Sequence, residues 1–316
     1  MAILVTGGLG YIGSHVVKML KEQGEEVIIV DFADQKLWAS SGCETFKLDI
    51  CAKSRLRDIF NEYQIEAVIH LAAYADIEDS IYNPHKYYVN NVAKSLALIE
   101  VMMDFDCNKF IFSSSAAVYG DPQTIPMCEN HHKQPVNPYG ASKLMLEDIL
   151  ETYRESYKFR SVSFRYFNAS GADQGGKIGE AHDPEHHIIP LLLRDAPVEI
   201  YGNDWNTPDG TCIRDFVHVN DIAQAHVLAL KSLREGNFGK VYNIGSGSGY
   251  SILQLIEAVE VVTGKKVDYK FTGRRAGDPG VLVASNDSIK HDLGWSPEYT
   301  DLETIIETAW QWHRKQ

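Results

Sequence analysis

The stretch Ile3-Leu-Val-Thr-Gly-Gly-Leu-Gly-Tyr-Ile-Gly13 decides the fold of this 316-residue chain. Its short apolar run reads as a buried strand, and apolar residues at helical spacing follow the glycines as far as position 23. Gly7, Gly10 and Gly13 stand at the turn between strand and helix. Glycine there permits a tight turn and lets the backbone approach a pyrophosphate, which the helix N-terminus attracts. The stretch therefore predicts a dinucleotide-binding unit.

An acidic residue at the end of the second predicted strand supports this interpretation. Asp31 lies 18 residues after Gly13, near the spacing of about 20 expected for a carboxylate that binds the cofactor ribose. Its charge would repel a 2′-phosphate, and the following Phe32, Ala33 and Asp34 supply no cation. We therefore expect NAD rather than NADP.

The first half of the chain repeats the alternation of strand and helix signals. Apolar runs occupy residues 27–30, 46–48, 67–69 and 110–112, and helical patterns cover 54–63 and 88–103. Strands that are apolar on both faces and separated by helices predict an α/β fold with a doubly wound parallel sheet. After residue 167 the pattern loosens, so we expect an NAD-binding domain over 1–167, joined by part of 217–246, and a smaller C-terminal substrate lobe over 168–316. Capping boxes predict helix starts at Ser251 and Thr300.

Tyr139 and Lys143 are spaced i, i+4 and so share one face of a predicted helix. A free phenol has a pKa of about 10, and a neighbouring ammonium together with a nicotinamide cation would lower it enough to make a base. Tyr82 and Lys86 have the same spacing, but Pro84 between them disfavours a regular helix. Ser115 follows the fifth predicted strand, at the sheet edge where ligands of such folds bind.

Composition excludes several other classes of protein. The formal net charge is −13, with 44% apolar and 23% charged residues, which argues against a nucleic-acid partner, a membrane surface and a disordered chain. No apolar stretch approaches the length of about 20 residues that a spanning helix needs, and the N-terminus does not resemble a signal peptide. Five cysteines without a C-x-x-C pair indicate a reducing, cytoplasmic location.

Taken together, these motifs resemble those of the extended short-chain dehydrogenase/reductases. The resemblance rests on residues 6–13, 87–91, 112–120, 137–143 and 165–168. Residues 202–211, 214–219, 274–278 and 293–295 narrow it to the UDP-glucose 4-epimerase family, and the similarity runs nearly end to end. It implies an isomerase that inverts C4 of a UDP-hexose through a transient 4-keto sugar, with bound NAD taking up and returning the hydride.

The resemblance also implies roles for individual residues. Tyr139 would be the base, Lys143 would tune it and bind the nicotinamide ribose, and Ser115 would assist at the 4-oxygen. The cofactor contacts would be Gly7, Gly10, Tyr11, Ile12, Gly13, Asp31, Asp49, Ile50, Leu71, Ala72, Asn90, Ser113, Tyr139, Lys143 and Tyr166. The UDP-sugar contacts would be Ser115, Tyr139, Asn168, His187, Ile188, Tyr201, Arg214, Arg275 and Asp278.

Several alternatives remain open from the sequence. A nucleotide-sugar 4,6-dehydratase would need an acid pair where Ala116-Ala117-Val118 stand, whereas epimerases of UDP-uronic acids or UDP-pentoses share the motifs. A silent NAD sensor would commonly lack the tyrosine or the lysine. Leu282 occupies a position where a bulky tyrosine in some members excludes N-acetylated sugars, so we expect tolerance of the N-acetylated pair.

Two further expectations concern metals and partners. His182, His186 and His187 lie near Asp183 and Glu185, but they lack the i, i+4 register of helical metal ligands. We expect solvated loop histidines and no metal site. The runs 88–103 and 144–157 have apolar residues to spare. The family pairs such helices in a four-helix bundle, which implies a homodimer, although core packing alone also explains the pattern.

Overall fold

The computed structural model describes residues 1–33, 42–194, 196–275 and 277–316. By their internal contacts these residues form two compact units, each described here by itself. Unit 1 contains residues 1–118, 133–165 and 223–242, and unit 2 contains residues 119–132, 166–222 and 243–316. The division at residue 167, with part of 217–246 returning to the first domain, stays a prediction.

A seven-stranded sheet forms the centre of unit 1 and confirms the predicted fold class. Its order is β11-β6-β5-β4-β1-β2-β3, and β1 pairs in parallel with both β2 and β4. The chain therefore leaves β1 toward one edge and later returns to its other side, which is the doubly wound topology with its switch point beside β1. The strands are β1 Ala2–Thr6, β2 Glu26–Asp31, β3 Glu44–Lys47, β4 Ile65–His70, β5 Lys109–Ser115, β6 Arg160–Tyr166 and β11 Lys240–Ile244.

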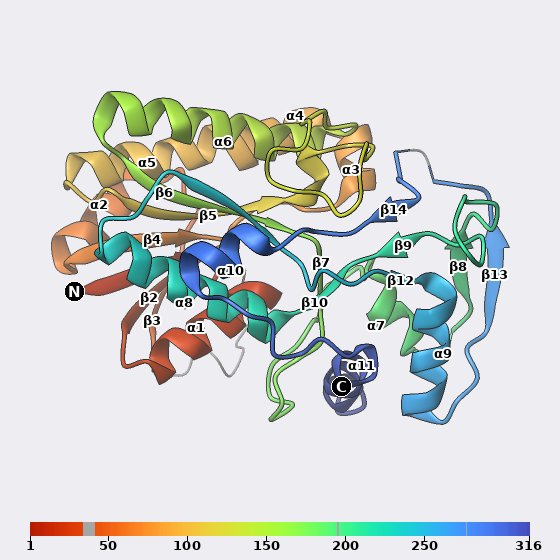
Figure 1. The fold of residues 1–316 in the computed structure, drawn as a ribbon. Helices are drawn as coiled ribbons and strands as arrows, with labels where there is room; N and C mark the ends of the chain where they lie inside the picture. The colour runs from red at the N-terminus through yellow and green to blue at the C-terminus, as the bar shows by residue number, and fades with distance from the viewer. Residues whose placement is uncertain (34–41, 195, 276) are drawn as a thin grey trace. The chain divides into compact units, whose positions relative to one another are not determined.

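Helices cover both faces of this sheet (Figure 1). On one face α2 (Lys53–Glu62), α5 (Lys94–Asp104) and α6 (Pro138–Tyr157) bury Leu56, Leu98 and Leu146 against alternate strand residues such as Leu4 and Phe110. Helices α1 (Tyr11–Glu22) and α8 (Val219–Arg234) lie on the other face. Because successive strand residues point to opposite faces, a sheet covered twice needs the unbroken apolar runs seen in the sequence.

The structure corrects several local expectations. The helix expected over 88–103 begins with a π-helical turn, Tyr88–Ala93, before α5. The helix expected to start at Thr300 is α11 (Leu302–His313), whose N-cap is Asp301; its carboxylate accepts from the N–H of Thr304 at 2.9 Å. The Ser251 capping box is confirmed. Between α2 and α5, short helices α3 (Ile77–Tyr82) and α4 (Pro84–Tyr87) complete this side of unit 1.

Unit 2 is built from small sheets and separate helices, as the loosened pattern predicts. Strands β7 (Asn168–Ser170) and β10 (Phe216–His218) pair, as do β8 (Val198–Tyr201) and β13 (Tyr269–Thr272). A third sheet has the order β12-β9-β14, from Tyr250–Ser251, Ile213–Arg214 and Val281–Leu282. Helices α7 (Ile188–Leu192), α9 (Ile252–Thr263) and α11 share an apolar core, and α10 covers Asp287–Leu293.

Candidate functional site

The glycine turn after β1 is shaped so that side chains would not fit. Gly7 has φ +72°, and a Cβ there would lie 2.6 Å from the main-chain nitrogen of Ala72. A Cβ on Gly13 would lie 2.0 Å from the carbonyl oxygen of Gly7. Gly10, the N-cap residue of α1, brings no side chain to the first-turn N–H groups, which include those of Tyr11 and Ile12. This turn fits a pyrophosphate that replaces the missing cap.

Asp31 holds the glycine turn from the end of β2. Its buried carboxylate accepts from the N–H of Leu9 and from the N–H of Ala33, both at 3.0 Å. The acid that the sequence assigns to the cofactor ribose is therefore fixed beside the turn. Asp34, also considered in the NAD prediction, lies outside the described residues, as does much of the 31–49 connection.

The predicted adenine-side residues follow β3 and β4. Asp49 is exposed and pairs with Lys94 at 2.5 Å, while Ile50 is buried in the sheet core. Leu71 and Ala72 continue β4, where the N–H of Leu71 donates to the carbonyl of Thr6 at 3.0 Å. This hydrogen bond sets the end of β4 against the start of the glycine turn.

The π-helical turn positions two asparagines beside this edge. Asn90, a predicted cofactor contact, donates from Nδ2 to Oδ1 of Asn91 at 3.2 Å. The buried Asn91 amide binds both main-chain groups of Tyr74 and donates to Oγ of Ser142 at 3.1 Å. Asn91 was missed by the sequence analysis. The helical spacing of the sequence did not indicate that Asn91 is buried, because a π turn changes which residues face inward. Such turns are frequent at functional sites.

The proposed catalytic residues meet where α6 begins over the end of β5. The side chain of Asn137 caps α6 by accepting from the N–H of Gly140 at 2.8 Å. The phenol of Tyr139 and the hydroxyl of Ser115 lie close enough to interact, and Oγ of Ser115 accepts from the N–H of Ala117 at 3.1 Å. One turn further along α6, the buried Lys143 Nζ donates to the carbonyl of Ser113 at 2.7 Å and lies 5.8 Å from the Tyr139 ring centroid. The serines expected after the fifth strand are its last residues.

Protonation of this pair differs from the sequence-based expectation. Burial raises the pKa of Tyr139, and its hydrogen bond with Ser115 acts in the opposite direction. Burial also lowers the pKa of Lys143 to about 7, against the effect of the Glu147 carboxylate. The prediction that the ammonium makes Tyr139 more acidic is therefore not met by the polypeptide alone, because the same burial disfavours both charges. The other part of the prediction, that a bound cationic nicotinamide ring lowers the pKa of Tyr139, stays a prediction.

Glu147 extends the row of Tyr139 and Lys143 by another turn of α6, and the sequence analysis missed it. It is buried and forms an ion pair with Arg165 of β6 at 2.6 Å. Oγ of Ser114 also donates to it, at 2.5 Å. Its negative charge favours the ammonium of Lys143. The i, i+4 spacing from Lys143 was a usable signal, but the burial of its partner Arg165 was not visible in the sequence.

Within unit 2 the predicted UDP-sugar residues Tyr201, Arg214, Arg275 and Asp278 form one neighbourhood. Arg275 donates through Nε and Nη2 to Asp278, at 3.0 Å each, and its Cζ lies 5.1 Å from the ring centroid of Tyr201. The charges of Arg214, Arg275 and Asp278 all act on the thiol of Cys212, whose pKa is raised mainly by burial. This part of the unit therefore combines two guanidinium groups with a partly exposed aromatic ring.

Arg214, Tyr166 and Asn168 each lie on a strand. Arg214 is buried, pairs in register with Leu282, and donates to the carbonyl of Ile213 at 3.0 Å. The carboxylate of the neighbouring Asp215 accepts from the N–H groups of Ser246, Gly247 and Ala284, so it is not an ion-pair partner that holds Arg214. Tyr166 is buried, and Asn168 begins β7.

The histidine-rich segment before α7 differs from expectation. His182 and His187 are partly exposed, but each contacts the carboxylates of Glu180 and Glu185. Both are exposed loop histidines, as expected, but their contacts with these carboxylates were not predicted. His187 is also the N-cap residue of α7, and Ile188 is the first residue of that helix.

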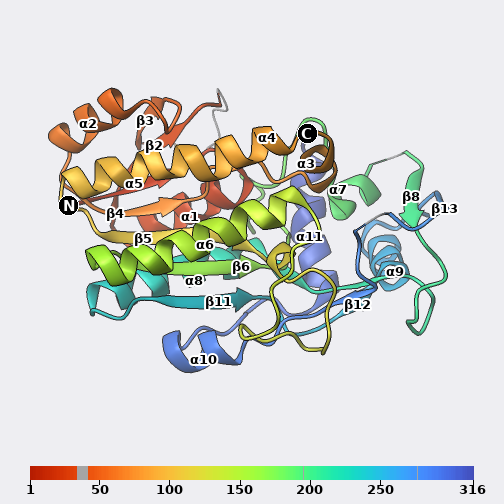
Figure 2. The same ribbon diagram turned by 90° about the horizontal axis from the view of Figure 1, so that it is seen from above.

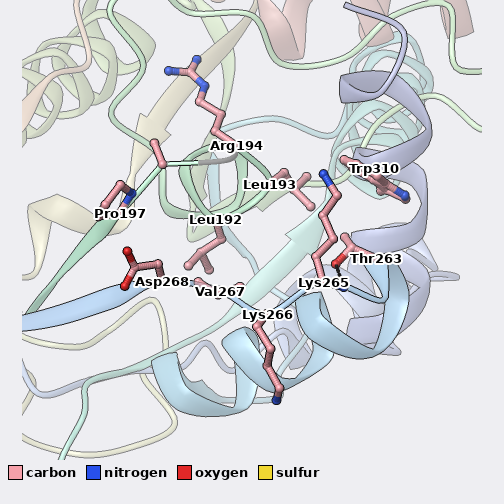
Figure 3. A pocket seen from close by; sticks show the side chains of 11 residues that line it. Leu192, Leu193, Arg194, Pro197, Thr263, Lys265, Lys266, Val267, Asp268 and Trp310 are labelled. Atoms are coloured by element: carbon pink, nitrogen blue, oxygen red, sulfur yellow. Dashed lines mark hydrogen bonds between the residues drawn. The ribbon is translucent and has the colours of Figure 1, made fainter.

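A separate cavity of about 250 Å³ lies between α7 and α9 of unit 2 (Figure 3). Leu192, Val267 and Trp310 line it, and Arg194 and Lys266 extend from it in opposite directions. It contains none of the residues that the sequence analysis assigns to cofactor or substrate, so it does not enter the site.

Three comparisons relate this chain to known proteins. The family model described as "NAD dependent epimerase/dehydratase family" matches residues 3–245. UDP-glucose 4-epimerase of Streptococcus mutans is 44% identical, over 99% of this chain and 97% of the relative. A crystal structure of a UDP-glucose 4-epimerase has a TM-score of 0.97 at 44% identity, covering 100% of this chain and 98% of its own.

A second solved structure was described with ligands. The Bifidobacterium longum UDP-glucose 4-epimerase, in complex with NAD+ and UDP, has a TM-score of 0.95 at 33% identity, covering 100% of this chain and 99% of its own.

Among the residues described, we find no helix with the length and apolar character needed to cross a membrane.

Proposed function

This chain belongs to the NAD-dependent epimerase/dehydratase family, and we propose from that premise that it inverts C4 of a UDP-hexose, interconverting UDP-glucose and UDP-galactose. It is an isomerase that uses NAD. The observation that carries the proposal is the contact between Tyr139 and Ser115 beside the buried ammonium of Lys143. A tyrosine held next to a hydroxyl can, as the phenolate, take a proton from a sugar alcohol and later return it.

The proton chemistry falls to Tyr139. Its oxygen, as the phenolate, would accept the proton of the sugar 4-hydroxyl while Ser115 donates to the same sugar oxygen, which fixes the sugar hydroxyl in line with Tyr139. Lys143 would stabilise the phenolate by its positive charge, and the carbonyl of Ser113 orients that ammonium. NAD, when bound, supplies the hydride acceptor at C4 and gives the hydride back. Return of the hydride to the opposite face of C4, with return of the proton from Tyr139 to the 4-oxygen, would complete the inversion.

The glycine turn and Asp31 are the residues that would hold the cofactor. The bare N-terminus of α1 suits the pyrophosphate, and the carboxylate of Asp31 suits a ribose diol while it disfavours a 2′-phosphate. Asn90, Lys143 and the adenine-side residues would complete the site.

The negatively charged diphosphate of the substrate needs cationic side chains around it. Because the chain as a whole is acidic, these cations must be gathered at the binding site. Arg214 and Arg275 offer guanidinium groups suited to bidentate phosphate contacts, and Asp278 orients the second of them. Tyr201, 37% exposed, offers a ring face for uracil. We assign the substrate contacts to these residues together with Asn168, His187 and Ile188.

We also propose a cytoplasmic homodimer. Helices α5 and α6 run side by side on one face of the unit 1 sheet (Figure 2). Val89, Met145 and Tyr157 are exposed apolar side chains on the π turn and on α6, and two such helix pairs would bury them in a four-helix bundle. Light scattering should give twice the chain mass, and Met145→Glu should give the monomer; a monomeric wild type would refute the proposed homodimer.

The cysteines support the cytoplasmic location. All five are free thiols, as suits a reducing compartment.

Incubation with UDP-galactose followed by product analysis tests the function. We expect UDP-glucose without net release of NADH. A dehydrated 4-keto-6-deoxy product would indicate the dehydratase alternative. If the protein converts only UDP-uronic acids or UDP-pentoses, its substrates belong to that class and not to the UDP-hexoses. Absence of any product would contradict the proposal.

A further inference from the structure

A compact group of metal-ligating side chains lies in unit 2, in the loop that leads into α7. Glu180, His182, Glu185 and His187 each offer one ligand atom, and these four atoms lie within 4.8 Å of one another. Nδ1 of His182 is 3.2 Å from Oε1 of Glu180, and Nδ1 of His187 is 3.7 Å from Oε1 of Glu185. The side chains therefore already converge on one point.

Burial makes this group different from an ordinary surface cluster. The side chain of Glu185 is fully buried and that of Glu180 nearly so, whereas the two histidines are partly exposed. Oε1 of Glu185 accepts from the N–H groups of His186 and His187, both at 2.9 Å. Oε2 of Glu185 is buried and has no hydrogen-bond partner among the described residues. A buried carboxylate oxygen without a partner is costly, and a bound cation would satisfy it.

We propose that Glu180, His182, Glu185 and His187 bind one divalent transition-metal ion of the Zn²⁺ type. Two carboxylates and two neutral imidazoles carry a charge of −2, which the ion would neutralise. The donor set of nitrogen and oxygen ligands matches zinc. Ligand atoms on a tetrahedral zinc with bonds of about 2.0–2.1 Å are roughly 3.3 Å apart, so the observed group needs only side-chain movement to close around an ion.

The expected role of the ion is structural. The carbonyl of Glu180 accepts from Nε1 of Trp312 on α11 at 2.8 Å, and His187 is the N-cap residue of α7. An ion held by residues 180–187 would thus fix this loop between two helices of unit 2. It takes no part in the proton and hydride transfer proposed above.

Calorimetric titration of the EDTA-treated, dialysed full chain with ZnCl₂ tests the site. Wild type should bind one equivalent that His182→Ala and Glu185→Gln each weaken by at least about 100-fold. His186→Ala is the matched control, because His186 lies in the same loop but outside the group of four. His187 is not varied, since it is also assigned to the substrate.

Two further measurements keep the result interpretable. Co²⁺ bound in place of Zn²⁺ should give the visible spectrum of nitrogen and oxygen ligation without a thiolate charge-transfer band, which separates this site from the exposed cysteines. Zn²⁺ should raise the Tm of wild type and His186→Ala but not that of Glu185→Gln. Circular dichroism shows whether each variant folds. If His182→Ala does not fold, the comparison with wild type uses Glu185→Gln instead.

The proposal fails if wild type binds no zinc at micromolar concentration, or if His186→Ala weakens binding as much as His182→Ala. It also fails if the cobalt spectrum shows thiolate ligation. None of these outcomes bears on epimerase activity, so failure of this site is distinguishable from failure of the proposed function.

Discussion

The ammonium of Lys143 donates to the main-chain carbonyl of Ser113 at 2.7 Å, which ties the first turns of α6 to the end of β5. Tyr139 on α6 also lies beside Ser115 on β5, so the relation between the phenol and the serine hydroxyl is set by how α6 packs on β5. The geometry of the proposed base is therefore set by the secondary structure and does not depend on a loop.

Tyr139→Phe removes only the hydroxyl that exchanges the proton. We expect kcat to fall by at least about 10²-fold, the usual scale for a general base, while NAD content stays at the wild-type level. Steady-state kinetics and cofactor quantification check this. Tyr82→Phe is the matched control, because Tyr82 has the same spacing to a lysine but is 75% exposed, and it should leave turnover unchanged. Equal turnover of Tyr139→Phe and wild type would remove Tyr139 from its role.

Lys143→Met should make the cofactor-free protein more stable at neutral pH while abolishing activity. Burial lowers the pKa of Lys143 from 10.5 to about 7, so below pH 7 the folded state carries the full cost of a buried ammonium. Removing it should raise the free energy of unfolding by about 1–3 kcal/mol.

The pH dependence gives this prediction its sign. Between pH 7 and 10.5 the unfolded chain binds more protons at this lysine than the folded chain, so wild-type stability rises with pH. The advantage of Lys143→Met should therefore shrink across that window in denaturant titrations. An advantage that grows with pH would contradict it.

Glu147→Gln tests a positioning residue. The Glu147 carboxylate raises the pKa of Lys143, so its loss should lower that pKa further and move the alkaline limb of the kcat profile to lower pH. Stability should also fall, by about 3–5 kcal/mol, because Arg165 loses its buried partner. Glu147→Asp keeps the charge and should restore the limb. A stability loss with an unmoved limb would leave Glu147 a purely structural role.

Leu282 pairs in register, on the neighbouring strand, with Arg214, which we assign to the substrate diphosphate. We expect wild type to convert UDP-N-acetylglucosamine, and Leu282→Tyr to lower kcat/KM for that sugar at least about 10-fold while UDP-glucose is little affected. The ratio of the two kcat/KM values is the readout. Equal exclusion of the N-acetylated sugar by both proteins would count against this.

The parts of the structure that follow local rules were predictable from the sequence. The glycine turn needs Gly7 and Gly13 because no Cβ fits there. The turn was therefore recognisable from the positions of the glycines in the sequence. The spacing of Tyr139 and Lys143 likewise converts into one face of α6 without knowledge of the rest of the fold. The doubly wound sheet follows because its strands are apolar on both faces.

Features that depend on contacts between distant segments were not predictable. Arg165 and Glu147 pair across a strand and a helix, and nothing local marks either as buried. The raised pKa of Tyr139 results from burial, which the i, i+4 spacing does not report. Glu180 and His187 meet because an irregular loop folds back, so a search for helical register missed them. Thr300 and Asp301 are both good N-caps, and the capping-box pattern selected Thr300 where the structure uses Asp301.

The central claim is that the same hydrogen leaves and returns to C4 while Tyr139 handles only the hydroxyl proton. Epimerisation of UDP-galactose in D₂O, followed by NMR of the UDP-glucose formed, tests it most directly. We expect protium to be fully retained at C4, because the hydride never exchanges with solvent. Deuterium at C4 of the product would contradict the claim.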